Sequence, residues 1–297
     1  MPTPSKKSFY VASTALGLSL MSFAAEAYPP LPNLVNLNFT QISGTPKECF
    51  VGGGQCSTDG GAGSADPVGW TGGSGLIFID GQSPSESADS ATYLPTYGDP
   101  RGSVSGNYVE ADGNPTYESG FNYTVTGLTI GQTYSLSFYQ GASEQQGFGL
   151  IDGRPQPTTD QWIVALTTVA SGGLQISSGG PTDPTYGPTD QYSSTDGSAS
   201  IVASPLMTVC YTCTVGWDYV TVDLTADATT DLLSFLAWGD NGSTVNLPPI
   251  AFLSGVDSPS GLGAVPEPAS LTLFAVGMAG LGAVARRHRR KKQPSAS

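Results

Sequence analysis

Hydrophobic and polar residues alternate with a period of two through much of the chain between residues 28 and 257, and helix-like spacing is scarce. Val35, Leu37 and Phe39 interleave with polar residues, and a second alternating run covers 133–140. In an extended backbone, every second side chain lies on the same face. Each run therefore predicts a β-strand with one buried face.

The clearest predicted hairpin joins strands at 121–126 and 133–140, because Gly127 and Gly131 can supply positive φ where the chain reverses. Roughly nine or ten short strands separated by turn-forming residues predict an all-β fold, an antiparallel, jelly-roll-like β-sandwich. The long polar stretches at 82–106 and 172–197 are expected to be surface loops or insertions. Further strands are expected at 75–80, 161–168, 200–203, 219–225, 232–238 and 250–253.

The N-terminus has the three parts of a secretory signal: two lysines, an apolar run at 10–24, and the small residues Ala25 and Ala27. We expect a signal helix that engages the Sec machinery and is cleaved before Tyr28. The alternative is an uncleaved N-terminal anchor, but the apolar run is short and the small residues follow it directly.

The C-terminus carries the triplet Pro266, Glu267 and Pro268, followed by seventeen apolar or small residues at 269–285. As a helix these residues span about 25 Å, which is barely enough to cross the hydrocarbon core of a bilayer. By the positive-inside rule, the basic tail after them stays in the cytoplasm and leaves the body outside. The strong cations of this tail are Arg286, Arg287, Arg289, Arg290, Lys291 and Lys292.

These three features, in this order at the terminus, resemble the PEP-CTERM sorting signal. The resemblance implies recognition by an exosortase in the inner membrane of a Gram-negative bacterium, and release to the periplasm, cell surface or extracellular matrix. Such proteins belong to bacteria that make exopolysaccharide. The alternative is an ordinary single-pass anchor. The expected organisation is a signal peptide at 1–27, a β-sandwich body at 28–257, a linker at 258–265 and the sorting signal at 266–297.

The expected exported body, 28–265, is strongly acidic. It holds Lys47, Arg101 and Arg154 against 22 acidic residues, once Glu26 and Glu267 are subtracted from the 24 in the chain, which gives a net charge of about −19. Nucleic-acid binding draws most of its affinity from neutralised phosphates, so this surface excludes DNA and RNA as partners. Solvation in a crowded compartment is the simpler explanation of the acidity.

All four cysteines lie in the exported body, where an oxidising compartment favours disulfides. Local pairs, Cys49 with Cys56 and Cys210 with Cys213, are the simplest of three connectivities. A four-cysteine zinc site is a weaker alternative, because more than 150 residues separate the two pairs. A redox-active motif at 210–213 is also less favoured, because no βαβ pattern surrounds it.

The body also resembles the galactose-binding-like jelly rolls found in many carbohydrate-binding modules. The residues that carry this resemblance are 34–39, Gly69 with Trp70, 106–110, and the segment 127–138. Together they cover about half of the body. The resemblance implies a β-sandwich that binds glycan.

That family's structural calcium site is not expected here, because Leu37 and Thr40 stand where it has a glycine and an acid. We therefore expect no cofactor. Other acid pairs are expected to be solvated rather than metal-binding, namely Asp218 with Asp223 and Asp227 with Asp231.

The only histidine in the chain is His288, in the basic tail. The body therefore cannot carry Ser-His-Asp or Cys-His catalysis or a histidine-ligated zinc. A carboxylate-dependent hydrolase or lyase remains open, since glycosidases need only two suitably separated acids. Acids that could form such a pair are Glu110, Glu118, Glu144 and Asp152.

Aromatic side chains are the binding candidates, because a flat ring stacks on the apolar face of a sugar. Trp70 and Trp217 adjoin glycines in loop-like surroundings, so they are candidate glycan contacts, with core packing as the alternative. Trp162 and Trp238 lie within expected strands and are expected to be core.

We expect a non-catalytic surface or matrix protein that binds glycan or has a structural role linked to exopolysaccharide. Asp112 and Asn114 could complete a polar rim around a bound sugar. A carboxylate enzyme and a protein-binding adhesin are the alternatives.

Overall fold

The structure is a computed structural model that describes residues 28–257, except 37, 45–47, 50–65, 73–74, 82–95, 99–105, 115–119, 147–149, 152–153, 156–157, 178–190 and 240–248. All of the described residues belong to one compact unit, Tyr28–Val265. The expected signal helix at 1–27, the linker and the C-terminal helix lie outside the described residues.

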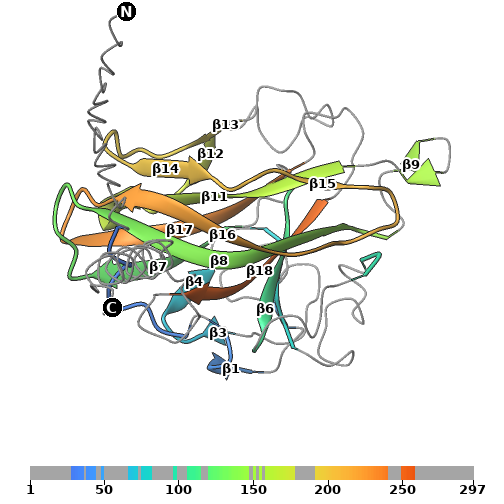
Figure 1. Cartoon of the computed structure of the whole chain (residues 1–297), viewed down its shortest axis with the longest axis horizontal. Helices are drawn as coiled ribbons and strands as arrows, with labels where there is room; N and C mark the ends of the chain where they lie inside the picture. The colour runs from blue at the N-terminus through green and yellow to red at the C-terminus, as the bar shows by residue number, and fades with distance from the viewer. Residues whose placement is uncertain are drawn as a thin grey trace, which may run out of the picture. The chain divides into compact units, whose positions relative to one another are not determined.

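Two antiparallel sheets, each of six strands among the described residues, form the expected all-β sandwich (Figure 1). Sheet I contains, in spatial order, β14 (Ser200–Ala203), β11 (Thr158–Thr168), β17 (Thr230–Gly239), β7 (Gly120–Thr126) and β4 (Trp70–Gly72), while β15 (Met207–Val209) also pairs with β11. Sheet II contains β16 (Val215–Thr225), β8 (Thr133–Glu144), β18 (Pro249–Asp257), β6 (Tyr108–Asp112), β5 (Ile77–Asp80) and β2 (Glu48–Cys49).

Three short strand pairs and one 3-10 turn complete the described elements. The turn η3 (Val169–Ser171) follows β11, and the polar stretch after it forms a small antiparallel pair rather than only a loop. The pairs are β1 (Ile42–Ser43) with β3 (Asp66–Pro67), β9 (Leu150–Ile151) with β10 (Arg154–Pro155), and β12 (Gln175–Ser177) with β13 (Gln191–Ser193).

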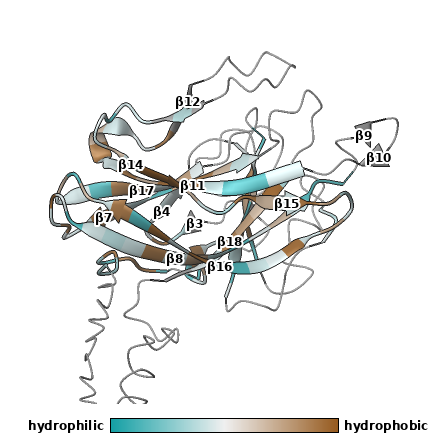
Figure 2. Ribbon diagram, turned by 45° about the horizontal axis from the view of Figure 1, so that its top comes forward, coloured by the Kyte–Doolittle hydropathy of each residue, from teal (hydrophilic) through white to brown (hydrophobic). Residues whose placement is uncertain are grey.

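The main core lies between the two sheets, where alternate residues of each long strand meet. Figure 2 shows the sheets as two layers with hydrophobic positions along the strands of both. The core includes Phe138 of β8, Trp162 of β11 and Phe235 of β17, each almost wholly buried. The strands expected at 75–80, 161–168, 200–203, 219–225, 232–238 and 250–253 are confirmed with small shifts of their ends.

The expected hairpin between 121–126 and 133–140 is wrong, although both strands exist. β7 pairs with β17 and β4 in sheet I, while β8 pairs with β16 and β18 in sheet II. The connection therefore crosses from one sheet to the other, with Gly127 and Gly131 at positive φ as expected. It hydrogen-bonds to the β16–β17 connection, which makes the same crossing, through Gly131 N to Ala226 O at 2.8 Å.

The alternation at 35–39 does not form the expected strand. Asn33, Asn36 and Phe39 all have positive φ, which breaks an extended backbone. Val35 is consequently exposed, whereas Asn36 is buried and exchanges two hydrogen bonds with the backbone of Gln41, at 2.8 and 2.9 Å.

The chain enters and leaves the sandwich beside the start of β8. Ser135 N donates to Pro29 O at 2.9 Å, and Pro30 makes a parallel bridge to Ser135. At the other end of the body, Asp257 of β18 pairs with Ser137 of β8. The two ends of the described body therefore lie within two residues of each other along one strand.

Candidate functional site

The face of sheet II that is turned away from sheet I carries cross-strand pairs of polar side chains. Alternate residues of β8 enter the core, so the residues between them lie on this outer face, opposite their partners on β16. The hydrogen-bonded side-chain pairs are Thr133–Thr225 at 3.0 Å, Ser135–Asp223 at 2.7 Å and Ser137–Thr221 at 2.8 Å.

The next pair along these strands is aromatic. Tyr139 lies opposite Tyr219, and their ring centroids are 5.0 Å apart with an interplanar angle of 56°. Tyr219 is 50% exposed, whereas Tyr139 is half-buried. Gly255 of β18 has φ +52 and lies beside Tyr139, because a Cβ there would be 3.2 Å from the ring. The glycine thus leaves room for the tyrosine ring on this face.

Trp217 lies on the same outer face as Tyr219, because the two are two residues apart on β16. The register of β16 on β8 shifts by one residue between Val215 and Asp218, so that Gly216 and Trp217 together lie opposite Gly141. The indole ring packs against Tyr108 at 5.7 Å and Phe252 at 6.3 Å, and remains half-buried. Gly141 has no side chain to occupy this space, so the indole can reach the strands beyond it.

We call this surface the aromatic-hydroxyl face. It offers rings that can stack on sugar C–H groups, hydroxyls that both donate and accept, and one exposed carboxylate acceptor. Its members are Thr133, Ser135, Ser137, Tyr139, Trp217, Tyr219, Thr221, Asp223 and Thr225.

Trp70, the other candidate contact, is a core residue. It is only 5% exposed, and its ring centroid lies 5.4 Å from that of Phe39, 5.3 Å from Phe121 and 5.1 Å from Tyr123. The alternative of core packing therefore holds at this position, because β4 forms the edge of sheet I with the indole pointing inward.

The two tryptophans expected in the core differ in burial. Trp162 is fully buried, as expected, and its Nε1 donates to Phe252 O of the opposite sheet at 3.1 Å. Trp238 lies outside the main core, half-buried on the outer face of sheet I, where it contacts Tyr192 of β13 edge-on at 5.4 Å. The Tyr192 ring shields part of the indole.

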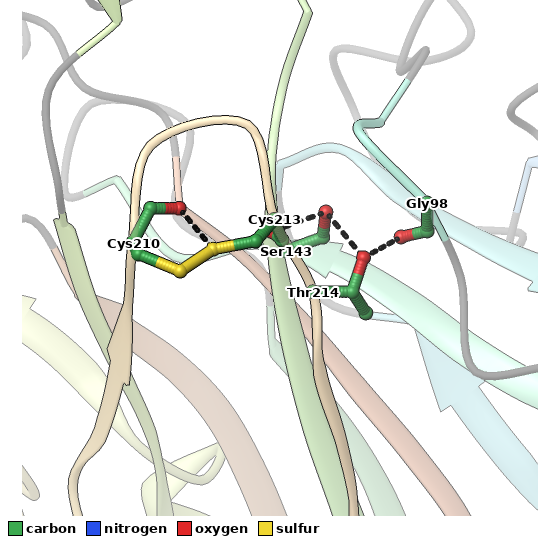
Figure 3. The surroundings of a disulfide bond; sticks show 5 residues. All are labelled: Gly98, Ser143, Cys210, Cys213 and Thr214. Atoms are coloured by element: carbon green, nitrogen blue, oxygen red, sulfur yellow. Dashed lines mark hydrogen bonds between the residues drawn. A yellow bond between two sulfur atoms is a disulfide. The ribbon is translucent and has the colours of Figure 1, made fainter.

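Cys210 and Cys213 form the expected disulfide, which closes the turn between β15 and β16 (Figure 3). Thr212 in this turn has φ +60, which is uncommon for a β-branched residue. Beside it, Thr214 donates through its hydroxyl to Gly98 O at 2.8 Å. The backbone of Cys49 lies in β2, while Cys56 and the expected pairing between them lie outside the described residues.

Removing this disulfide is expected to cost about 2 kcal/mol of stability, because closing so short a loop removes little entropy from the unfolded chain. The double variant Cys210→Ser with Cys213→Ser should show this loss in urea denaturation under non-reducing conditions. A free energy of unfolding equal to that of the wild-type chain would contradict the expectation.

Several acidic side chains are buried at the end of the sandwich opposite the chain's entry. Burial raises the pKa of Asp112 to about 7, while a hydrogen bond from Asn114 N at 2.7 Å lowers it. Burial also raises the pKa of Asp160 well above its ordinary value, a hydrogen bond from Gln161 N lowers it, and nearby Asp112 raises it further. Burial raises the pKa of Glu144 to about 7, and the nearby backbone of Thr212 lowers it.

These acids do not form an exposed site. Asp112 is 1% exposed and Asn114 is fully buried, so the polar rim expected from them is wrong. Both flank Gly113, which packs closely against the Asp160 carboxylate of sheet I. Glu110 and Glu144 are also fully buried. Glu118 and Asp152 lie outside the described residues.

The solvation expected of the second pair, Asp227 with Asp231, is wrong for Asp231. Asp231 is fully buried. Its pKa is raised to about 6, mainly by burial and to a smaller extent by the neighbouring carboxyl group of Asp227. Its carboxylate accepts from Asp227 N at 3.2 Å and so caps the β16–β17 connection. In contrast, Asp218 and Asp223 are exposed, as expected.

No group of three or more His, Cys, Asp or Glu side chains suited to holding a metal occurs among the described residues. Within the same residues, no helix is both long and apolar enough to span a bilayer. The expected cleavage site at Ala25 and Ala27, the triplet Pro266, Glu267 and Pro268, and the basic tail all lie outside the described residues.

Comparison with known families supports the C-terminal interpretation. Residues 264–290 match the PEP-CTERM protein-sorting motif, which indicates an exported protein sorted through an exosortase system. No curated protein matches the chain.

Solved structures give only weak likenesses. One is the enzymatically active domain of bacteriophage CBA120 tailspike protein 4, with 8% identity, coverage of 64% of this chain and 19% of that chain, and a TM-score of 0.29. Another is a family 16 carbohydrate-binding module, with 15% identity, coverage of 57% of this chain and 86% of that chain, and a TM-score of 0.25. A third is a Clostridium thermocellum xylanase 10B fragment with xylohexaose, with 10% identity, coverage of 74% of this chain and 27% of that chain, and a TM-score of 0.22. The chain thus spans about a fifth of the first structure's length. At these TM-scores the likenesses carry no argument about the ligand.

Proposed function

We propose that this exported protein binds glycan, without catalysis, through the aromatic-hydroxyl face. The observation that carries the proposal is Tyr219, 50% exposed and backed by Tyr139, beside rows of paired hydroxyls. A sugar ring presents apolar C–H groups on one side and hydroxyls around its edge. The face presents rings and hydroxyls side by side in the same way.

The proposal of a non-catalytic role draws support from the burial of the acids. Asp112 and Asp160 lie close together, but they are 1% and 0% exposed. A substrate could not reach them without opening the sandwich. The one acid of the face, Asp223, is exposed on β16 beside hydroxyls, and exposed Asp218 adjoins Tyr219 in sequence but is not a member of the face.

The proposed role in an exopolysaccharide matrix rests on this face together with the sorting motif. The matched motif at 264–290 indicates export, so a glycan-binding body would meet polysaccharide outside the inner membrane. The final location at the periplasm, cell surface or matrix of a Gram-negative bacterium is part of this proposal.

The test is binding of the full chain, purified in mild detergent, to an array of polysaccharides that includes the producer's own. Tyr219→Ala should weaken binding at least about tenfold, because it removes the most exposed ring of the face. The matched control is Tyr211→Ala: Tyr211 is 60% exposed but lies in the disulfide-closed turn.

Equal loss of binding in both variants would contradict the assignment of the face. Release of reducing ends in the same wells would favour a carboxylate hydrolase or lyase instead. An array without any binding would favour a structural or adhesive role.

A further inference from the structure

We infer that the glycan bound by the aromatic-hydroxyl face is uncharged, an inference that rests on the proposed function. The charged side chain within the face is an acid, Asp223, and exposed Asp218 adjoins Tyr219 in sequence. Among the residues that the structure describes, the only Lys or Arg is Arg154, which lies in β10 and pairs with β9. The described part of the face thus offers an anionic sugar no charge-assisted donor.

The hydrogen bonding of the face suits a neutral polyol. Each hydroxyl pair, such as Ser137 with Thr221, uses one O–H proton in its mutual bond and leaves the other proton able to donate. The paired oxygens also keep lone pairs that can accept. Sugar hydroxyls have the same dual character, so they can match such a surface in either direction.

The carboxylate of Asp223 adds a further preference for an uncharged sugar over an anionic one. Its carboxylate accepts from Ser135 at 2.7 Å and is exposed, so it can accept a further bond from a sugar hydroxyl. A sugar carboxylate or sulfate placed about 7 Å away would instead be repelled. Coulomb's law puts that penalty at roughly threefold to fiftyfold in affinity, from bulk water to a protein surface.

The net charge of the whole body also disfavours an anionic glycan. Its net charge of about −19, from three strong cations against 22 acids, repels a polyanion before contact. This longer-range repulsion is screened by salt, whereas binding of a neutral chain is not sensitive to salt. Salt dependence therefore separates the two classes of ligand.

The experiment compares polymers that share a backbone and differ in charge: hydroxyethyl cellulose with carboxymethyl cellulose, dextran with carboxymethyl dextran, and the best neutral binder of the array with its carboxylated derivative. The full chain should bind the neutral member of a pair at least about threefold more tightly at low salt. That preference should shrink as salt approaches about 0.5 M. Tighter binding of the anionic member at low salt would overturn the inference while leaving the proposed function intact.

A matched pair of variants assigns the preference to the face. Asp223→Asn and Thr124→Lys each raise the net charge by one, but Thr124 is exposed on β7 of the other sheet. The ratio of anionic to neutral binding should rise about threefold or more in Asp223→Asn and less in Thr124→Lys. Equal changes in the two variants would overturn the inference. Failure of every polymer to bind would instead overturn the proposed function, and the inference with it.

Discussion

Replacing Trp162 with alanine is expected to lower the free energy of unfolding by about 4 kcal/mol or more and to leave little folded protein. The indole is fully buried in β11, edge-on to Phe121 at 5.8 Å and Phe235 at 6.1 Å. Its Nε1 donates to Phe252 O, so the same side chain links the two sheets. Truncation would create a large cavity and leave a buried carbonyl without its donor, which adds about 1 kcal/mol.

Urea denaturation followed by circular dichroism measures the effect. Trp238→Ala is the matched control, since Trp238 is half-buried outside the main core and should cost less than about 2 kcal/mol. Trp162→Phe retains much of the packing but loses the donor, so it should fall between the two. Similar losses for Trp162→Ala and Trp238→Ala would refute the structural role given to Trp162.

The protein is expected to lose stability as pH rises through about 7, because of Asp112. Its pKa is raised from an ordinary value of 3.8 to about 7 in the folded state. When a carboxyl group has a higher pKa in the folded state than in the unfolded state, it stabilises the folded state fully at pH values below its pKa in the unfolded chain. This contribution is lost as the pH rises through its pKa in the folded state. For a shift of this size the contribution of Asp112 is about 4 kcal/mol between those limits. The pKa values of Asp160, Glu144 and Asp231 are raised in the same direction and add to the trend.

Unfolding free energies measured from about pH 4 to about pH 8.5 test this expectation. Asp112→Asn cannot ionise at this position, so it should make the decline smaller and be more stable than the wild-type chain above pH 7. Asp218→Asn, at an exposed position, is the control and should follow the wild-type curve. A wild-type stability that rises across this range would show that the buried carboxyl of Asp112 does not behave as described.

Strand positions could be predicted from the sequence, but strand partners could not. Alternation places 121–126 and 133–140 correctly as β7 and β8, and it also marks which residues enter the core. A connection of this length fits both a hairpin and a crossing between sheets, since Gly127 and Gly131 have positive φ in either case. The deciding contact is Gly131 N with Ala226 O, about a hundred residues away, which no local pattern reveals.

Local polar character was also a poor guide to burial. Asn36, Asp112 and Asp231 are all buried because nearby backbone groups satisfy part of their hydrogen bonding. Such acceptors depend on turns that form only in the folded chain.

The candidate site was partly visible in the sequence. The sequence marks Trp217 as a candidate from loop-like surroundings, whereas it lies in strand β16, two residues before Tyr219 on the same face. Tyr139 and Tyr219 were missed because tyrosines are common in this chain and their pairing depends on register. The alternation at 133–139 did contain the signal: its polar members are the ones that form the face.

The position of β18 beside β8 has a mechanical consequence. β18 leads through Asp257 toward the matched sorting motif, and β8 carries four of the nine residues of the proposed binding face. If the body is held through its C-terminal segment while a polymer pulls on the face, the load passes between two adjacent strands. For a pull along the strands, this ladder is loaded in shear: it pairs Pro249–Ser254 with Glu144–Tyr139 and, past a shift in register, Asp257 with Ser137.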